Sequence, residues 1–232
     1  MRTLILASLL YAGTMSDGFS DIVYYIDYEA PTYTNGQQIG GGSTETISDS
    51  INGLSTQGLL IHDGGGINYF APQAFTSGVH LVSWDFAIPG GQGANVIINA
   101  QLHSAGSQSI LFDTTIAGSA SGIEVEYGQG FPQRPSVLIN IGEAYSFQVL
   151  MNLDANFYSF WLDGNLLEDA VGISSETSLE FVAFGQNQTL GLQAGIDNFR
   201  WEVVPEPSTM ALLALAGVGL AIRARYSHTS AS

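Results

Sequence analysis

The sequence predicts an all-β protein, a two-sheet antiparallel sandwich, and two observations lead to that prediction. Apolar and polar residues alternate with period two along short segments throughout residues 21–204, as they do in half-buried strands. Turn-forming stretches such as 163–165 (Asp-Gly-Asn) and 89–91 (Pro-Gly-Gly) separate these segments, and none shows an amphipathic helical period with caps. About a dozen short strands without intervening helices favour two packed sheets, closed as a jelly roll.

The expected strands carry their apolar residues on one face. Tyr145, Phe147, Val149, Met151 and Leu153 form the clearest such face. The remaining segments predicted as strands are, in chain order, 22–29, 58–62, 79–88, 95–103, 109–113, 123–127, 136–141, 179–184 and 196–204.

The charge balance excludes several classes of function. The chain has 21 Asp and Glu against 5 basic residues, all Arg, and no cysteine. Nucleic-acid binding needs clustered Lys and Arg, so it is excluded, as are disulfides and thiolate chemistry. Residues 21–207 contain 20 acidic residues and two arginines, a formal net charge of −18. Such a domain repels anionic polymers, so a neutral glycan, or an acidic one held through calcium, is the expected partner.

Both ends of the chain have the composition of targeting segments. Arg2 precedes a short apolar run at 4–12, followed by small residues, which predicts a signal peptide over residues 1–20. Near the other end, Pro205 and Pro207 precede an uninterrupted apolar run at 210–222. This run predicts a single membrane helix, and the arginines that follow it predict a cytoplasmic tail at 226–232.

The C-terminal segment resembles a known sorting signal. Pro205, Glu206 and Pro207, the apolar run, and Arg223 with Arg225 are similar to the PEP-CTERM signal of Gram-negative bacteria, over residues 205–225. The resemblance implies recognition by an exosortase and the export machinery, temporary retention in the inner membrane, and delivery to the cell surface or the extracellular matrix. It also implies an association with exopolysaccharide.

The central domain resembles concanavalin-like and laminin-G-like jelly rolls. The similarity lies in the hairpin at 145–167, the opening segment 26–29 and the closing segment 195–200. It implies the fold and a tendency to bind glycans, for which Trp84, Trp161 and Tyr158 are candidate stacking rings. In many such domains the first and last strands share a structural calcium ion. The residues that would hold it are Asp27, Glu29 and Asp197, since calcium prefers oxygen ligands.

Glu124 and Glu126 are the candidate catalytic residues. Their spacing on a strand places both carboxylates on one face, as a retaining glycosidase requires, with Ile123, Val125 and Tyr127 facing inward. Jelly-roll laminarinases have a longer acidic signature with a third carboxylate, which this sequence lacks. A solvated strand face therefore explains the pair better than catalysis does.

The sequence as a whole favours an exported, non-enzymatic sandwich that associates with exopolysaccharide, either as a glycan-binding module or as a structural one. Two alternatives stay open. One is an atypical laminarinase-like glycoside hydrolase that uses Glu124 and Glu126. The other is a structural matrix protein without a specific ligand. Calcium is the one cofactor that the sequence suggests.

Overall fold

The structure is a computed structural model, and its described part is all-β, as the sequence predicts. The described residues are 21–39, 45–49, 51, 53–54, 56–62, 64–89, 97–104, 109–119, 122–129, 134–173, 178–186 and 193–205. They form fourteen strands and no helix. The strands are β1 (Asp21–Ile26), β2 (Glu45–Ser48), β3 (Gly58–His62), β4 (Gly66–Phe75), β5 (Val79–Ala87), β6 (Ile97–His103), β7 (Ile110–Ser119), β8 (Gly122–Gly128), β9 (Ser136–Ile139), β10 (Ala144–Asn152), β11 (Phe157–Leu162), β12 (Asn165–Gly172), β13 (Leu179–Gln186) and β14 (Gln193–Val204).

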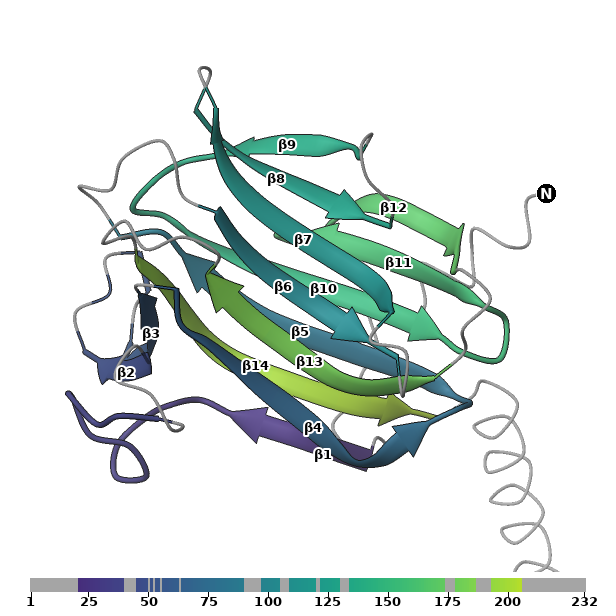
Figure 1. Ribbon diagram of the computed structural model, residues 1–232, viewed down its shortest axis with the longest axis horizontal. Helices are drawn as coiled ribbons and strands as arrows, with labels where there is room; N and C mark the ends of the chain where they lie inside the picture. Colours follow the sequence, from purple (N-terminus) through teal and green to yellow (C-terminus); the bar gives the residue numbers. More distant parts are fainter. Residues whose placement is uncertain are drawn as a thin grey trace, which may run out of the picture.

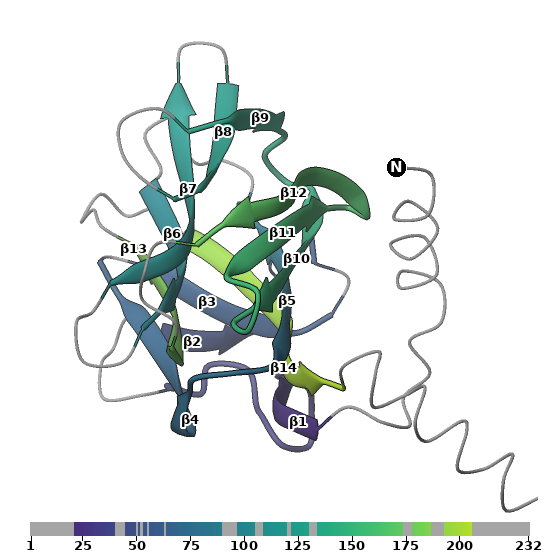
Figure 2. The same ribbon diagram turned by 90° about the vertical axis from the view of Figure 1, so that its right-hand side faces the viewer.

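The strands form two antiparallel sheets that pack face to face (Figures 1 and 2). Sheet A has eight strands in the order β12-β11-β10-β5-β14-β3-β2, and β1 is added beside β14. Sheet B has six, in the order β4-β13-β6-β7-β8-β9. β14 is central to sheet A, because β5 runs along one of its edges while β3 and then β1 pair with the other. Strands distant in sequence are therefore neighbours in both sheets.

The inner faces of the two sheets form one aromatic-rich core. Trp84 of β5 stacks on Phe147 of β10 at 5.3 Å between ring centroids, and it meets Phe184 of sheet B edge-on at 5.5 Å. Phe112 of sheet B in turn contacts Phe160 of sheet A at 5.2 Å. Each fully buried side chain of this size stabilises the fold by roughly 1.5–3 kcal/mol. These ring contacts hold the sheets together without disulfides.

The structure adds three strands that neither the sequence pattern nor the hairpin resemblance at 145–167 predicts, namely β2, β4 and β12. All three lie at the edge of a sheet. Edge strands carry prolines and charges that protect them from further pairing, and these residues weaken the alternating pattern. Pro72 lies within β4, and Glu168 and Asp169 lie within β12.

The first predicted strand is shorter than expected. β1 ends at Ile26, although the pattern predicts a strand to Glu29. Tyr28 has a φ of 55°, which is incompatible with an extended backbone. Its ring is buried, so the side chain contributes to the core from outside the sheet.

The predicted signal peptide at 1–20, the apolar run at 210–222 and the two arginines after it lie outside the described residues. β1 begins at Asp21 and β14 ends at Val204. Within the described ranges, no helix has the length and hydropathy needed to cross a membrane.

Candidate functional site

The outer face of sheet B, the side turned away from the core, carries most of the polar candidates. Along β6, Ala100 and Leu102 point into the core, so Asn99, Gln101 and His103 point outward. Antiparallel pairing sets the neighbours of these residues in the adjacent strands. Gln101 is opposite Ala183 of β13 and Asp113 of β7, and Asn99 is opposite Gly185 and Thr115.

Three rings form a continuous row across β4, β13 and β6 on this face. Phe70, Phe181 and His103 are directly paired in register. The ring centroids of Phe70 and Phe181 are 4.9 Å apart, and His103 stacks on Phe181 at 4.3 Å with an interplanar angle of 9°. Phe70 is 52% exposed. We call Phe70, Phe181 and His103 the ring row.

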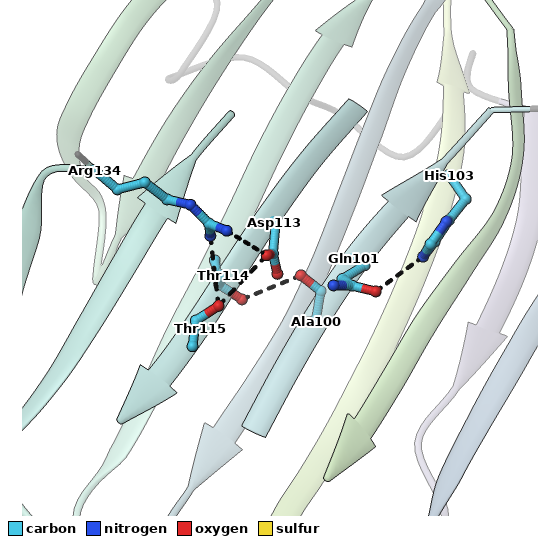
Figure 3. A network of polar contacts seen from close by, with 7 residues as sticks. All are labelled: Ala100, Gln101, His103, Asp113, Thr114, Thr115 and Arg134. Atoms are coloured by element: carbon cyan, nitrogen blue, oxygen red, sulfur yellow. Dashed lines mark hydrogen bonds and ion pairs between the residues drawn. The ribbon is translucent and has the colours of Figure 1, made fainter. Parts of the chain in front are cut away.

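Amide side chains lie directly beside the ring row. The Nε2 atom of His103 is 3.0 Å from Oε1 of Gln101, which fixes the orientation of the imidazole (Figure 3). Next to Gln101 and Asn99, β13 presents only Ala183 and Gly185. These small residues leave the surface of the sheet open between the rings and the amides, where a flat ligand could lie.

A buried ion pair holds the segment before β9 against the same face. One terminal nitrogen of Arg134 donates to Oδ2 of Asp113 at 2.8 Å, and the other donates to Oγ1 of Thr115 at 3.4 Å (Figure 3). Both charged side chains are 3% exposed. The side-chain amide of Gln129 also donates to the carbonyl of Leu111. Together these contacts attach the chain between β8 and β9 to β7.

Glu124 and Glu126 lie on this outer face, one strand beyond Asp113. Their neighbours Ile123, Val125 and Tyr127 are buried, so the strand is oriented as its sequence predicts. Glu126 is opposite Thr115 on one side and Ser136 on the other, while Glu124 is opposite Ala117 and Leu138. Both glutamates are half-buried.

Asp197, one of the carboxylates proposed for calcium, lies at the bulge of β14, in sheet A. Asp197 is buried, and its Oδ2 accepts a hydrogen bond from the hydroxyl of Thr56 at 2.8 Å. Asn198 donates from its backbone to the other oxygen at 2.8 Å, and its side chain donates to Asp85 at 2.8 Å. Burial raises the pKa of Asp197 from 3.8 to about 6, and the nearby carboxylates of Glu29 and Asp85 raise it further against these hydrogen bonds.

The other two calcium candidates contact each other. Oδ1 of Asp27 accepts the backbone N–H of Glu29 at 3.1 Å. Oε1 of Glu29 is enclosed without a hydrogen-bond partner. Among the described residues, no three acidic or histidine side chains are grouped so that they could hold a metal ion. Any cation here would need further oxygen ligands, such as hydroxyl or carbonyl groups.

Two of the three candidate stacking rings are core residues. Trp84 and Tyr158 are each 1% exposed, so neither offers a ring face to a ligand. The hydroxyl of Tyr158 donates to Glu168 at 2.5 Å; burial, followed by this contact, raises its pKa well above the usual value. Trp161 is half-buried on the outer face of sheet A. The ring row is not predicted by the sequence, although Gln101 and His103 alternate with core residues along 95–103.

A comparison with protein-family models identifies the C-terminal segment. Residues 203–225 match the PEP-CTERM protein-sorting motif. The chain carries a PEP-CTERM sorting motif. The match includes the expected motif residues Pro205, Glu206, Pro207, Arg223 and Arg225. The motif indicates exosortase-dependent export through a membrane-anchored sorting intermediate in Gram-negative bacteria.

Solved structures share the fold of this protein at low sequence identity, whereas a search of curated proteins finds no match. The carbohydrate recognition domain of Emp46p is 9% identical, with a TM-score of 0.51 over 79% of this chain and 97% of that one. The catalytic domain of a family 131 glycoside hydrolase from Coprinopsis cinerea is 10% identical, with a TM-score of 0.52 over 80% and 95%. A carbohydrate esterase from a Shiga toxin-encoding bacteriophage is 11% identical, with a TM-score of 0.59 over 81% and 100%. These structures confirm the concanavalin-like jelly roll; at such identities they establish the fold alone.

Proposed function

We propose that this exported protein binds glycans through the ring row and the adjacent amides of sheet B, as a non-enzymatic module associated with exopolysaccharide. The exposed stack of Phe70 on Phe181 is the observation on which the proposal rests. Burying a phenylalanine stabilises a fold by roughly 1.5–3 kcal/mol, so the exposure of Phe70 forgoes part of this gain. The C–H faces of sugars stack on such rings, while Gln101 and Asn99 can bond the hydroxyls.

Two further observations support this proposal. The solved structures of similar fold include a carbohydrate recognition domain. The sorting motif also indicates export, and the delivery to the cell surface or the extracellular matrix that we propose would bring the chain to exopolysaccharide. The proposed partners are therefore an exosortase and the inner membrane during sorting, and the polymer afterwards.

The test of glycan binding compares the two sheets. Full-length protein is titrated with a panel of neutral and charged oligosaccharides, alongside the variants Phe181→Ala and Trp161→Ala. We expect Phe181→Ala to weaken binding about tenfold or more, because it removes the centre of the ring row. Trp161→Ala, a ring on the outer face of sheet A, serves as the matched control. Loss of binding in Trp161→Ala alone would move the site to sheet A.

A glycoside hydrolase is the second candidate, because Glu124 and Glu126 share their face with the ring row. A glycan lying across the strands would bring its linkages toward these carboxylates. If β-glucans are cleaved, Glu124→Gln or Glu126→Gln should lower the rate by a factor of about 100 or more. If the protein neither binds nor cleaves these glycans, the remaining function is that of a structural matrix protein without a specific ligand.

We also propose a calcium ion near Asp197 and Glu29, with hydroxyl or carbonyl oxygens completing its ligands, because the described acidic residues do not form a group of three around one position. The enclosed Oε1 of Glu29 and the raised pKa of Asp197 support this, because a cation would satisfy the first and would offset the burial and, to a lesser degree, the like charges that raise the second. The ion would supply structural stability. Excess EDTA should lower the melting temperature by about 5–10 °C, and calcium should restore it. A melting temperature unmoved by EDTA would remove the proposal.

The sorting route has a separate test. Deletion of the exosortase gene should leave the protein at full length in the inner membrane, whereas the wild-type host delivers it to the surface or the medium. The substitution Glu206→Ala in the motif should reproduce the retention. Unchanged delivery in the deletion strain would make the segment a plain membrane anchor.

A further inference from the structure

Two enclosed side-chain oxygens on the outer face of sheet B have no hydrogen-bond partner. They are Oδ1 of Asn99 and Oδ1 of Asp113. Both are acceptors, and they lie on adjacent strands at diagonal positions, because Asn99 pairs with Thr115 and Gln101 pairs with Asp113. Asn99 is only partly buried, so its amide can turn toward a ligand. A ligand that donates a hydrogen bond can satisfy the oxygen of Asn99.

The charges on this face are predominantly negative. Asp113, Glu124 and Glu126 lie on it, and among the described residues Arg134 is its one arginine, already bound to Asp113. Glu126 shares a cross-strand row with Asn99 and Thr115, two strand spacings or about 10 Å from Asn99. The chain as a whole carries a formal charge of −16. A uronate or a sulfate would bring acceptors and a repelled charge to this face, which fits neither property.

An ammonium group satisfies both requirements at once. It provides three donors and no acceptor, and its positive charge is attracted by the carboxylates of β8. A neutral hydroxyl provides a donor without the charge. A glycan stacked on the ring row would place the amino groups of successive sugars toward Asn99 and toward Glu126.

We infer that this face selects glycans whose sugars carry free amino groups, such as partly deacetylated amino-sugar polymers, over neutral and acidic glycans. The inference rests on the proposed glycan binding and names the class of ligand. Stacking on Phe70 and Phe181 supplies affinity for any glycan, while Asn99 and Glu126 distinguish the amine. The preference is electrostatic, so it weakens as salt screens the carboxylates.

The test uses full-length protein and three oligosaccharides of equal length, made of glucosamine, N-acetylglucosamine and guluronate. Dissociation constants are measured at about pH 6, below the ordinary pKa of an amino group, in about 0.15 M and 1 M salt. The variants are Glu126→Gln, which is isosteric, Phe181→Ala, and Asp21→Asn as a control. Asp21 is exposed on β1 of sheet A, so its substitution removes the same charge from the other sheet.

We expect the glucosamine oligomer to bind about tenfold or more tightly than the N-acetylated one in the lower salt, with little binding of guluronate. Glu126→Gln should remove most of this preference at an unaltered melting temperature, whereas Asp21→Asn should retain it. Phe181→Ala should weaken the binding of both the amino and the N-acetylated oligomers.

Three results would overturn the inference. Equal affinities for the glucosamine and N-acetylated oligomers, both weakened by Phe181→Ala, would leave glycan binding standing without selection for amines. If Asp21→Asn and Glu126→Gln lower the preference for the glucosamine oligomer equally, the amine is attracted by the overall charge of the protein and is not bound at a specific site. Absence of binding to all three oligomers, and to the wider panel, would remove the proposed function together with the inference.

Discussion

Asp113 and Asp197 are each 2% exposed, one in each sheet, and the protein compensates their burial in different ways. Asp113 faces Arg134 at 2.8 Å. Asp197 is bonded by the neutral donors of Thr56 and Asn198, and the nearby charges of Glu29 and Asp85 are of its own sign. A buried carboxylate requires a cation, hydrogen bonds or a proton. In sheet B, Arg134 neutralises the carboxylate of Asp113. In sheet A, a proton or a bound metal ion can neutralise the carboxylate of Asp197.

The largest expected effect is at Asp113. Asp113→Ala leaves the guanidinium of Arg134 buried without its counter-ion, so the free energy of unfolding should fall by about 3–5 kcal/mol in urea denaturation. The double substitution of Asp113→Leu with Arg134→Met replaces the pair by apolar groups and should recover most of that loss. A loss below about 1 kcal/mol in Asp113→Ala would mean that the pair does not stabilise this face.

The second prediction concerns Asp197 and pH. Its pKa is raised from 3.8 to about 6, so between these values the folded state binds a proton that the unfolded state does not. In EDTA, the contribution of Asp197 to the free energy of unfolding should therefore increase as pH falls from about 6 to about 4, by on the order of 2–3 kcal/mol, and it should be absent above pH 6.

Urea denaturation across this pH range, with Asp197→Asn as the control, isolates the contribution from that of the other acidic residues. The variant lacks the titrating group, so its pH dependence should be shallower than that of the wild type. Saturating calcium, if it binds here, should lower the pKa of Asp197 and flatten the wild-type curve too. Identical slopes in EDTA for the wild type and the variant would contradict the assigned pKa.

The smallest effect is expected at Arg200, the second arginine of the domain. Its pair with Glu202, at 2.8 Å, lies within a single strand, and the arginine side chain is 30% exposed. Arg200→Ala should therefore cost about 1 kcal/mol or less, because partly solvated ion pairs contribute little. A loss as large as that of Asp113→Ala would show that Arg200 also joins separate parts of the fold.

The sequence predicted the central strands of the sheets and the edge strand β9, and the three strands that it missed all lie at sheet edges. β5, β10 and β14 are predicted because one face of each is apolar along its whole length. β2, β4 and β12 lie at edges, where charges and a proline replace part of that pattern. Alternation reports burial of a face, so strands with less buried surface give a weaker signal.

The candidate site was only partly visible in the sequence. The common orientation of Glu124 and Glu126 follows from local spacing, since alternate residues of a strand point to the same side. The ring row joins Phe70, Phe181 and His103 from three strands that become neighbours only in the folded sheet. No local pattern encodes the order β4-β13-β6, so this contact could not be inferred from the residues alone.

The sequence by itself determined the fold class, the acidic character of the domain and the sorting motif, because these depend on composition and short-range order. The tertiary structure decided which aromatic rings face solvent: Trp84 and Tyr158 pack in the core, while Phe70 and Phe181 stack outside it. It also decided that Arg134 neutralises Asp113. Burial and ion pairing depend on which strands are adjacent, and pairing between distant segments is set by the packing of the whole sandwich.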